Sequence, residues 1–142
     1  MKKNVLIEMK SIQIVSNDEK SEMELTTTGT FDEKDGEYII SYEDSEATGF
    51  EGSVTDITVK ENEIASIIRS GASSSNLIIE HGKKHFCHYA TPFGEFIVGI
   101  NTKKIENNLT SDGGILYMKY TIDLNSSYMS DNEIILNIKN LN

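Results

Sequence analysis

The side chains best suited to metal binding gather in one short stretch of the sequence. Its three histidines, His81, His85 and His88, and its single cysteine, Cys87, fall within eight residues. Zinc accepts imidazole and thiolate ligands but needs three or four of them to converge. On a β-strand, His85 and Cys87 share one face, His88 takes the other, and His81 reaches in only from a turn. We therefore expect no metal site and a buried Cys87. A metal-assisted enzyme built on His81, His85 and Cys87 remains an alternative. Its remaining metal ligands would have to be carboxylates.

Nucleophilic catalysis has equally little support in the sequence. A thiol and its base must lie within about 3 Å, yet His88 projects away from Cys87, and His85 is separated from it by roughly 6.5–7 Å of strand rise. Ser73–Ser75 follows a glycine without the Gly-x-Ser-x-Gly pattern of a nucleophile elbow. No glycine-rich phosphate-binding loop occurs either. We predict no catalytic residue and no cofactor.

Arg69 is the strongest candidate for a binding residue. It is the only arginine in the sequence, and it follows two isoleucines. A guanidinium stays charged when partly buried and pairs with carboxylates in a bidentate manner. Arg69 could close a barrel end in a structural ion pair, perhaps with Glu43, or it could anchor the anionic end of a ligand. Under either interpretation Tyr42 and Asp44 would supply neighbouring polar groups.

A second candidate segment runs from Tyr89 to Phe96 and contains the only proline of the chain. Proline cannot donate to a sheet ladder, so it marks a turn or an edge. The segment is typical of a strand–turn–strand corner. Tyr89 and Thr91, just before this turn, could line a cavity.

The charge balance excludes two classes of partner. The sequence has 23 acidic and 13 basic residues and a formal net charge of −10. This disfavours nucleic-acid binding and docking on anionic membranes, which both depend on positive charge. Residues 1–71 carry 16 acidic and 7 basic side chains, whereas residues 72–142 carry 7 and 6. The acidic half could face a cationic ligand or a basic partner, or it could consist of solvated strand faces that prevent edge-to-edge aggregation.

Composition and periodicity both predict an all-β chain. Isoleucine, valine and threonine, which favour strands, number 19, 5 and 11. Apolar residues alternate with polar ones in most segments. The expected strands are 5–15, 22–31, 38–42, 53–60, 63–70, 76–80, 85–90, 95–103, 115–124 and 132–141.

Two irregularities qualify this pattern. Within Val5–Val15 the apolar residues change phase, which predicts a β-bulge near Lys10 and Ser11. The segment Lys103–Leu109 is predicted to form one short helical turn. The intervening linkers are too short for parallel crossovers. We therefore expect about eight to ten antiparallel strands in one domain, residues 1–142, closed as a barrel rather than folded as a sandwich.

Several segments, taken together in order and spacing, resemble the YwiB-like family of small bacterial proteins of unknown function. The resemblance implies a calycin-type β-barrel, related in architecture to lipocalins, and it brings no catalytic residues. Tyr42, Glu43 and Arg69 match the more distinctive positions of the family, and Asp44 stands where a glutamate is expected. The matching segments are Thr27–Gly29, Ser41–Glu43, Arg69–Gly71, Tyr89–Gly94, Thr102 with Leu109 and Gly114, and Tyr120–Ile122.

These observations lead to one functional hypothesis and one alternative from another class. We expect a non-enzymatic barrel that binds a small amphipathic or anionic ligand, with Arg69, Tyr42 and Glu43 at its polar end. The alternative is a protein-interaction or homodimer module that uses a sheet face. A single cysteine and an N-terminal apolar stretch interrupted by Glu8 and Lys10 predict a cytoplasmic protein.

Overall fold

The computed structural model describes residues 2–15, 18–46, 48–91, 94–124 and 127–141, with the side chains of Ala90 and Thr91 outside the described part. Within these residues the chain forms ten β-strands and no helix, so no helix that could cross a membrane is found among them. The strands are β1 (Lys3–Val15), β2 (Lys20–Lys34), β3 (Glu37–Glu43), β4 (Ser53–Lys60), β5 (Ile64–Gly71), β6 (Ser75–Glu80), β7 (Lys84–Thr91), β8 (Gly94–Thr110), β9 (Gly113–Leu124) and β10 (Ser127–Asn140).

The strands form a closed antiparallel barrel in which each pairs with its neighbour in sequence and β1 pairs with β10. This confirms the all-β barrel predicted from the alternation of apolar residues. A tight turn joins β2 to β3, where Asp35 and Gly36 both adopt the positive φ that a two-residue reversal requires. Closure leaves the apolar side of the strands facing a common interior.

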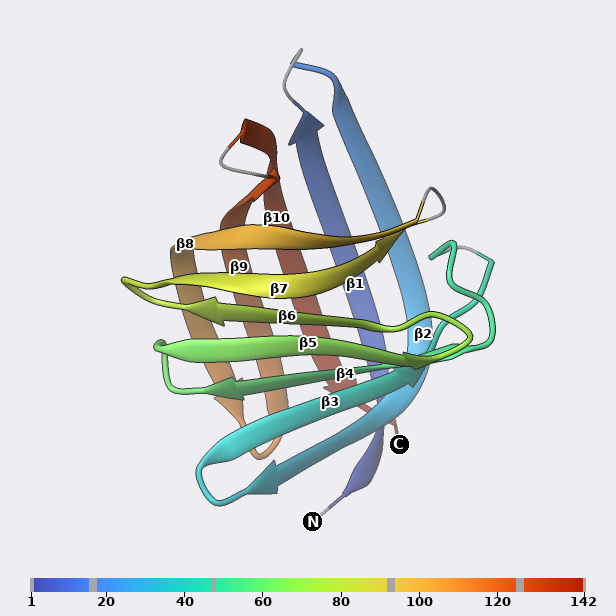
Figure 1. Cartoon of the computed structure of the whole chain (residues 1–142). Coiled ribbons are helices and arrows are strands. Elements are labelled where there is room, and N and C mark those ends of the chain that lie inside the picture. The colour runs from blue at the N-terminus through green and yellow to red at the C-terminus, as the bar shows by residue number, and fades with distance from the viewer. Residues whose placement is uncertain (1, 16–17, 47, 92–93, 125–126, 142) are drawn as a thin grey trace.

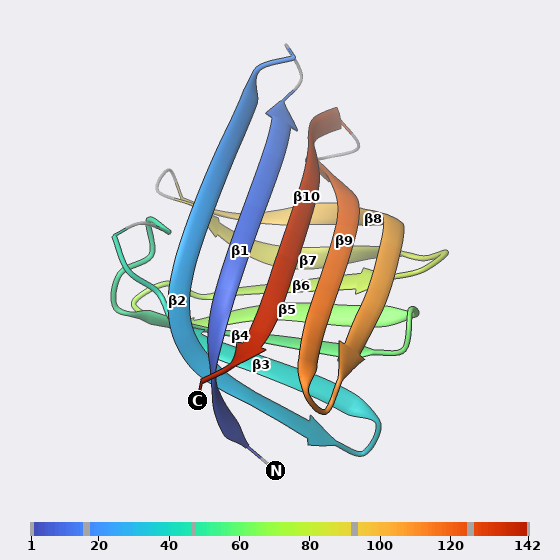
Figure 2. The ribbon, with the colours of Figure 1, turned by 180° about the vertical axis from the view of Figure 1, so that it is seen from behind.

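Two long strands, β2 and β8, take part in both walls of the barrel. β2 pairs with β1 along Lys20–Phe31 but with β3 only along Thr30–Lys34. β8 pairs with β7 through Gly94–Asn101 and with β9 through Gly99–Thr110, with an irregularity at Lys103. Strands β3–β7 therefore cross in front of β1, β9 and β10 (Figure 1), which lie side by side with β2 in the view from behind (Figure 2).

Gly29 permits the change of direction in β2. A Cβ at this position would lie 2.2 Å from the carbonyl oxygen of Ser41 and 2.8 Å from Cδ1 of Ile7. Any side chain would therefore push β3 away from β2 where the two strands begin to pair. The β2 half before Gly29 has β1 as its partner but not β3, and it exposes Glu22 and Glu24. Charged side chains on a strand edge oppose pairing with other chains.

Two local predictions were wrong. β1 has no bulge at Lys10 and Ser11, because its register with both β10 and β2 is unbroken. The phase change instead marks the place where the inward residues of β1 become polar. The predicted helical turn at Lys103–Leu109 is a strand, since β8 continues to Thr110 in register with β9. Regular pairing with β9, the next strand along the chain, outweighs weak local propensity.

Candidate binding cavity in the barrel

A cavity of about 290 Å³ lies inside the barrel. Its walls come from both groups of strands and from the loop between β3 and β4. The lining combines aliphatic and aromatic side chains with several polar groups, so it suits a small molecule that has both apolar and polar parts. The lining residues are Met9, Ser11, Gln13, Met23, Tyr42, Thr48, Phe50, Ile57, Ile67, Arg69, Leu77, Tyr89, Tyr120, Asn132 and Ile134.

The strand register explains why one level of the cavity is polar and the next is apolar. On the inner face of β3, β4 and β5, Tyr42 lies opposite Thr55, and Thr55 opposite Arg69. Two residues away from this row, Ile57 on β4 lies opposite Ile67 on β5. Because side chains on one strand face alternate with a period of two, these rows stack as successive layers of the interior. The apolar layer continues to Leu77 on β6 and forms one end of the cavity.

Arg69 is the charged group of the polar layer. Its Nε donates hydrogen bonds to Asp44 Oδ2 at 3.4 Å and to Thr55 Oγ1 at 3.2 Å. Thr55 in turn donates to the same carboxylate oxygen at 2.6 Å. The guanidinium lies over the ring of Phe50, with Cζ 3.8 Å from the ring centroid. The side chain of Asp44 is completely buried and that of Arg69 is 14% exposed. Buried charges of this kind must be paired, and here each neutralises the other.

Three tyrosines surround this guanidinium. Burial raises the pKa of Tyr42, and the charge of Asp44 raises it further while Arg69 lowers it. Burial likewise raises the pKa of Tyr89 and of Tyr120, with the charge of Arg69 acting in the opposite direction. All three phenols are therefore neutral at physiological pH. Neutral hydroxyls can both donate and accept hydrogen bonds, so they suit the polar end of a ligand.

A polar network without charge occupies the wall formed by β1 and β10. Gln13 donates from Nε2 to Oδ1 of Asn132 at 3.2 Å, and Asn132 donates from Nδ2 to Oγ of Ser130 at 3.0 Å. Gln13 and Asn132 are Cα partners in the β1–β10 ladder. Since β1 and β10 lie behind β4 and β5 (Figure 1), this network and Arg69 belong to opposite walls of the barrel. The lumen is therefore polar on two sides.

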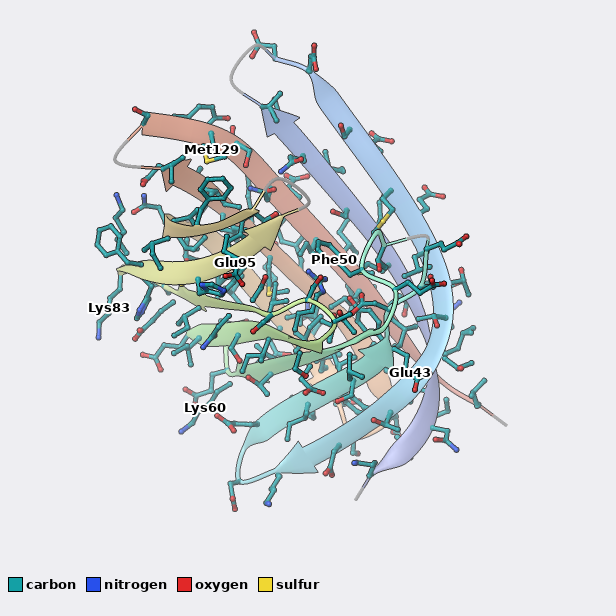
Figure 3. All side chains as sticks on the ribbon, turned by 45° about the vertical axis from the view of Figure 1, so that its right-hand side comes forward. Glu43, Phe50, Lys60, Lys83, Glu95 and Met129 are labelled. Atoms are coloured by element: carbon teal, nitrogen blue, oxygen red, sulfur yellow. The ribbon has the colours of Figure 1, made fainter. Side chains whose placement is uncertain are left out.

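The structure brings together three of the five residues predicted to bind a ligand. Arg69, Tyr42 and Tyr89 all line the cavity. Glu43 does not join them: it is exposed and borders a shallow outer groove between β2 and β3, and Figure 3 shows it on the outside of the barrel. The side chain of Thr91 lies outside the described residues. The ion-pair partner of Arg69 is Asp44 rather than Glu43, because alternate residues of a strand face opposite sides.

Several contributors to the site are not among the five residues predicted to bind a ligand. The sequence predicts Asp44 only as a neighbouring polar group. Phe50 lies in a loop without periodicity, so no sequence pattern indicated it. The others had a signal: Gln13 and Asn132 continue the inward alternation of β1 and β10, and Tyr120 continues that of β9. A regular alternation along these strands, with no bulge in β1, predicts that all three side chains point into the barrel.

The histidine and cysteine segment forms no site of its own. Cys87 is buried, as predicted, and its sulfur accepts a hydrogen bond from the backbone N–H of Ile78 at 3.3 Å. Burial raises the pKa of this thiol. His85 contacts Glu80 at 2.8 Å and His88 contacts Glu95 at 3.3 Å. Among the described residues, no three His, Cys, Asp or Glu side chains are placed to hold a metal ion.

Comparison with known proteins agrees with this architecture. A family model described as a domain of unknown function (DUF1934) matches residues 7–136. The chain is also similar to the crystal structure of the ywiB protein from Bacillus subtilis, with a TM-score of 0.74 and 20% sequence identity over 96% of this chain and 92% of that chain. No curated protein matches. The predicted YwiB-like resemblance is thus confirmed, and at this identity the structural likeness concerns the fold alone.

Proposed function

Because the chain belongs to the DUF1934 family, whose function is unknown, its function has to be argued from its own cavity, and we propose that it binds one small amphipathic molecule inside the barrel. The binding is not accompanied by catalysis. The observation that carries this proposal is the cavity of about 290 Å³ that places one arginine and three tyrosines beside a layer of aliphatic side chains. An interior closed by side chains, with Arg69 sealed in its ion pair, would have argued against it.

The apolar part of the ligand would pack on the aliphatic layer. Ile57, Ile67 and Leu77 form this layer on one wall, and Ile134 faces it from β10. Burying apolar area contributes about 25 cal/mol per Å². Ligand cavities for drug-sized molecules range from roughly 300 to 1,000 Å³, so this lumen suits a compact molecule at the small end of that range. A barrel of the calycin type, which the family resemblance implies, would serve as a rigid container for such a molecule.

The polar part of the ligand would lie against Arg69. Asp44 and Thr55 accept hydrogen bonds from Nε, and the hydroxyl of Tyr42 forms a further side-chain hydrogen bond with Arg69. The ligand would meet the terminal nitrogens of the guanidinium beside this hydroxyl. They are donors only, and the group they recognise is an oxygen acceptor such as a carboxylate, a sulfonate or a carbonyl. Asp44 already neutralises Arg69, and the whole chain carries −10. A neutral or singly charged ligand is therefore favoured over a multiply charged one.

An aromatic sulfonate tests the proposal directly. We expect anilinonaphthalene sulfonate to bind one per chain with a rise in fluorescence, because it combines an apolar body with an oxygen acceptor. The double variant Arg69→Met, Asp44→Asn should weaken this binding at least tenfold. Both charges are removed together because Arg69→Met alone would leave a buried, unpaired Asp44. The neighbouring change Glu43→Gln should leave binding unchanged, since Glu43 faces outward.

Native mass spectrometry of freshly purified protein complements the dye. A retained small molecule, absent from the double variant, would support the proposal and reveal the class of natural ligand. Failure of the dye to bind, together with a spectrum of the bare chain only, would refute it. Equal affinity of the wild type and the double variant would refute the role of Arg69.

A further inference from the structure

Large apolar side chains gather on the outer face of β5–β8, away from the cavity. Phe86 on β7 is 72% exposed, Ile97 on β8 is 60% exposed and Ile68 on β5 is 39% exposed. Ile78 on β6 is half-buried and shares this outward face. We call these four residues the outer apolar patch. Single exposed apolar residues are ordinary on protein surfaces, whereas a contiguous group of them marks an interaction site.

The strand register places the four apolar residues on diagonals rather than in one row. Asn76 and His88 lie between Ile68 and Ile97 in one row across the sheet. Ile78 and Phe86 lie two residues from Asn76 and His88 on the same face and form the next row. Phe86 precedes His88 by two residues on the same face, and its neighbour on β8 is Gly99. The Lys84 side chain lies over Gly99, and its Nζ is 5.3 Å from the centroid of the Phe86 ring and 2.8 Å from Oδ2 of Asp123. Phe86 is nevertheless 72% exposed, so a partner could pack against the part of the ring that Lys84 leaves open.

Charged residues lie at both ends of the patch and also within it, where Lys84 pairs with Asp123 beside Phe86 and Asp56 lies opposite Ile68. Lys83 and Lys84 stand where β6 turns into β7, whereas Glu95 stands near the start of β8, at the opposite end of the β7–β8 pair. Figure 3 shows Lys83 at the outer turn and Glu95 further along the sheet. Their ion pairs within the chain, Lys83 with Glu80 and Glu95 with His88, are exposed and weak. They can rearrange when a partner approaches.

The overall charge distribution favours a second copy of this chain as the partner. Two chains of net charge −10 repel each other unless they meet through a face with little charge. Residues 1–71 carry a net charge of −9 and residues 72–142 a net charge of −1. Ile78, Phe86 and Ile97 belong to the second group and Ile68 to the first. Contact through the outer apolar patch therefore brings mainly the less charged half of each chain to the interface.

We propose that the protein forms a homodimer through the outer apolar patch. The two-fold axis lies in the plane between the sheets and perpendicular to the β7 strands, because this orientation brings the Lys83 end of one copy onto the Glu95 end of the other. The contact is isologous, so each charge pair occurs twice. It leaves the lumen untouched, and the proposal is independent of ligand binding.

The experiment is sedimentation with light scattering over a range of protein concentrations. The wild type should have about twice the 15.9 kDa of a single chain. The double variant Phe86→Ser, Ile97→Ser should have the monomer mass and keep the strand signal of the wild type in circular dichroism, since both side chains are exposed. Ile115→Ser removes an exposed isoleucine from the outer face of β9 and should leave the dimer intact. A wild type that stays monomeric at every concentration would overturn the proposal.

A charge exchange tests the orientation. Lys83→Glu alone and Glu95→Lys alone should each weaken the dimer at least threefold, and the two changes together should restore it. Restoration requires that the two positions face each other across the interface. Additive weakening in the double variant would reject this orientation, and dye binding in the lumen should be the same in all three variants.

Discussion

At the scale of single residues, the decisive feature of the site is a charged pair placed beside neutral phenols. Asp44 and Thr55 hold the guanidinium of Arg69 through Nε, and Phe50 covers one of its faces. The pair has no net charge, so burial costs less than for a lone arginine. Tyr42, which accompanies it, also faces the sulfur of Met9 at 3.9 Å. Each group is therefore restrained before any ligand arrives, which reduces the entropy cost of binding.

The buried phenols predict a loss of stability at alkaline pH. Burial raises the pKa of Tyr42, Tyr89 and Tyr120 above the ordinary value of 10.0. Above pH 10 the unfolded chain therefore loses these protons before the folded chain does. The stabilising contribution is complete below pH 10 and is lost as the pH rises toward the folded-state values.

Urea unfolding between pH 8 and pH 11, a range that spans roughly the ordinary tyrosine pKa, checks this prediction. Tyr120→Phe should make the alkaline loss of stability shallower, because it removes one phenol that must ionise on unfolding. Tyr128→Phe, at an exposed position, should change the slope much less. Equal slopes in the wild type and in Tyr120→Phe would contradict the assignment.

At the scale of elements, the bent strands β2 and β8 decide the shape of the barrel. Each pairs with one neighbour along one half and with another along the other half. β8 changes direction near the irregularity at Lys103, and β2 does so near Gly29. Bulges and glycines are the usual means of turning a strand from one sheet into another. The cavity lies where these two groups of strands face each other.

Replacing Gly29 tests the bend in β2. Gly29→Ala should destabilise the fold by about 2–3 kcal/mol or more, because the new Cβ would lie 2.2 Å from the backbone oxygen of Ser41, and backbone cannot rotate away. Thr28→Ala, at the exposed neighbouring position, should cost less than about 0.5 kcal/mol. The free energies come from urea unfolding, and a Gly29→Ala variant as stable as the wild type would show that β2 and β3 can separate without penalty.

At the scale of the whole molecule, the barrel keeps a cavity that a chain selected only for stability would fill. Hydrogen bonds between neighbouring strands run around the closed barrel. The rest of the interior is packed with large aliphatic residues such as Ile7, Leu116 and Leu136. Space beside a packed core costs stability in proportion to its volume. Proteins accept such costs where function requires them.

Filling the lumen should therefore raise stability and reduce binding together. Ser11→Leu adds an apolar side chain at a position that lines the cavity, and we expect it to stabilise the fold by about 0.5–2 kcal/mol. Dye affinity should fall at the same time. Ser11→Ala removes the same hydroxyl without adding bulk and serves as the matched control. Increased stability with unchanged dye affinity would place the dye outside the lumen.

The sequence by itself determined the strands, their antiparallel order and the inward position of Arg69, Tyr42 and Tyr89. These features follow from alternation with a period of two and from linkers too short for crossovers, both of which are local properties of the chain. The buried Cys87 was predictable for the same reason.

Only the tertiary structure decided what these residues meet. Asp44, Thr55 and Phe50 reach Arg69 from two other segments, and no local pattern encodes a contact between segments. Pairing with β9 also made Lys103–Leu109 a strand, and pairing with β10 and β2 kept β1 regular. Because β1 is regular, the change in its apolar alternation means that Ser11 and Gln13 point inward and form a polar wall of the cavity. Pairing energy belongs to the whole barrel, and for that reason it can override local preference.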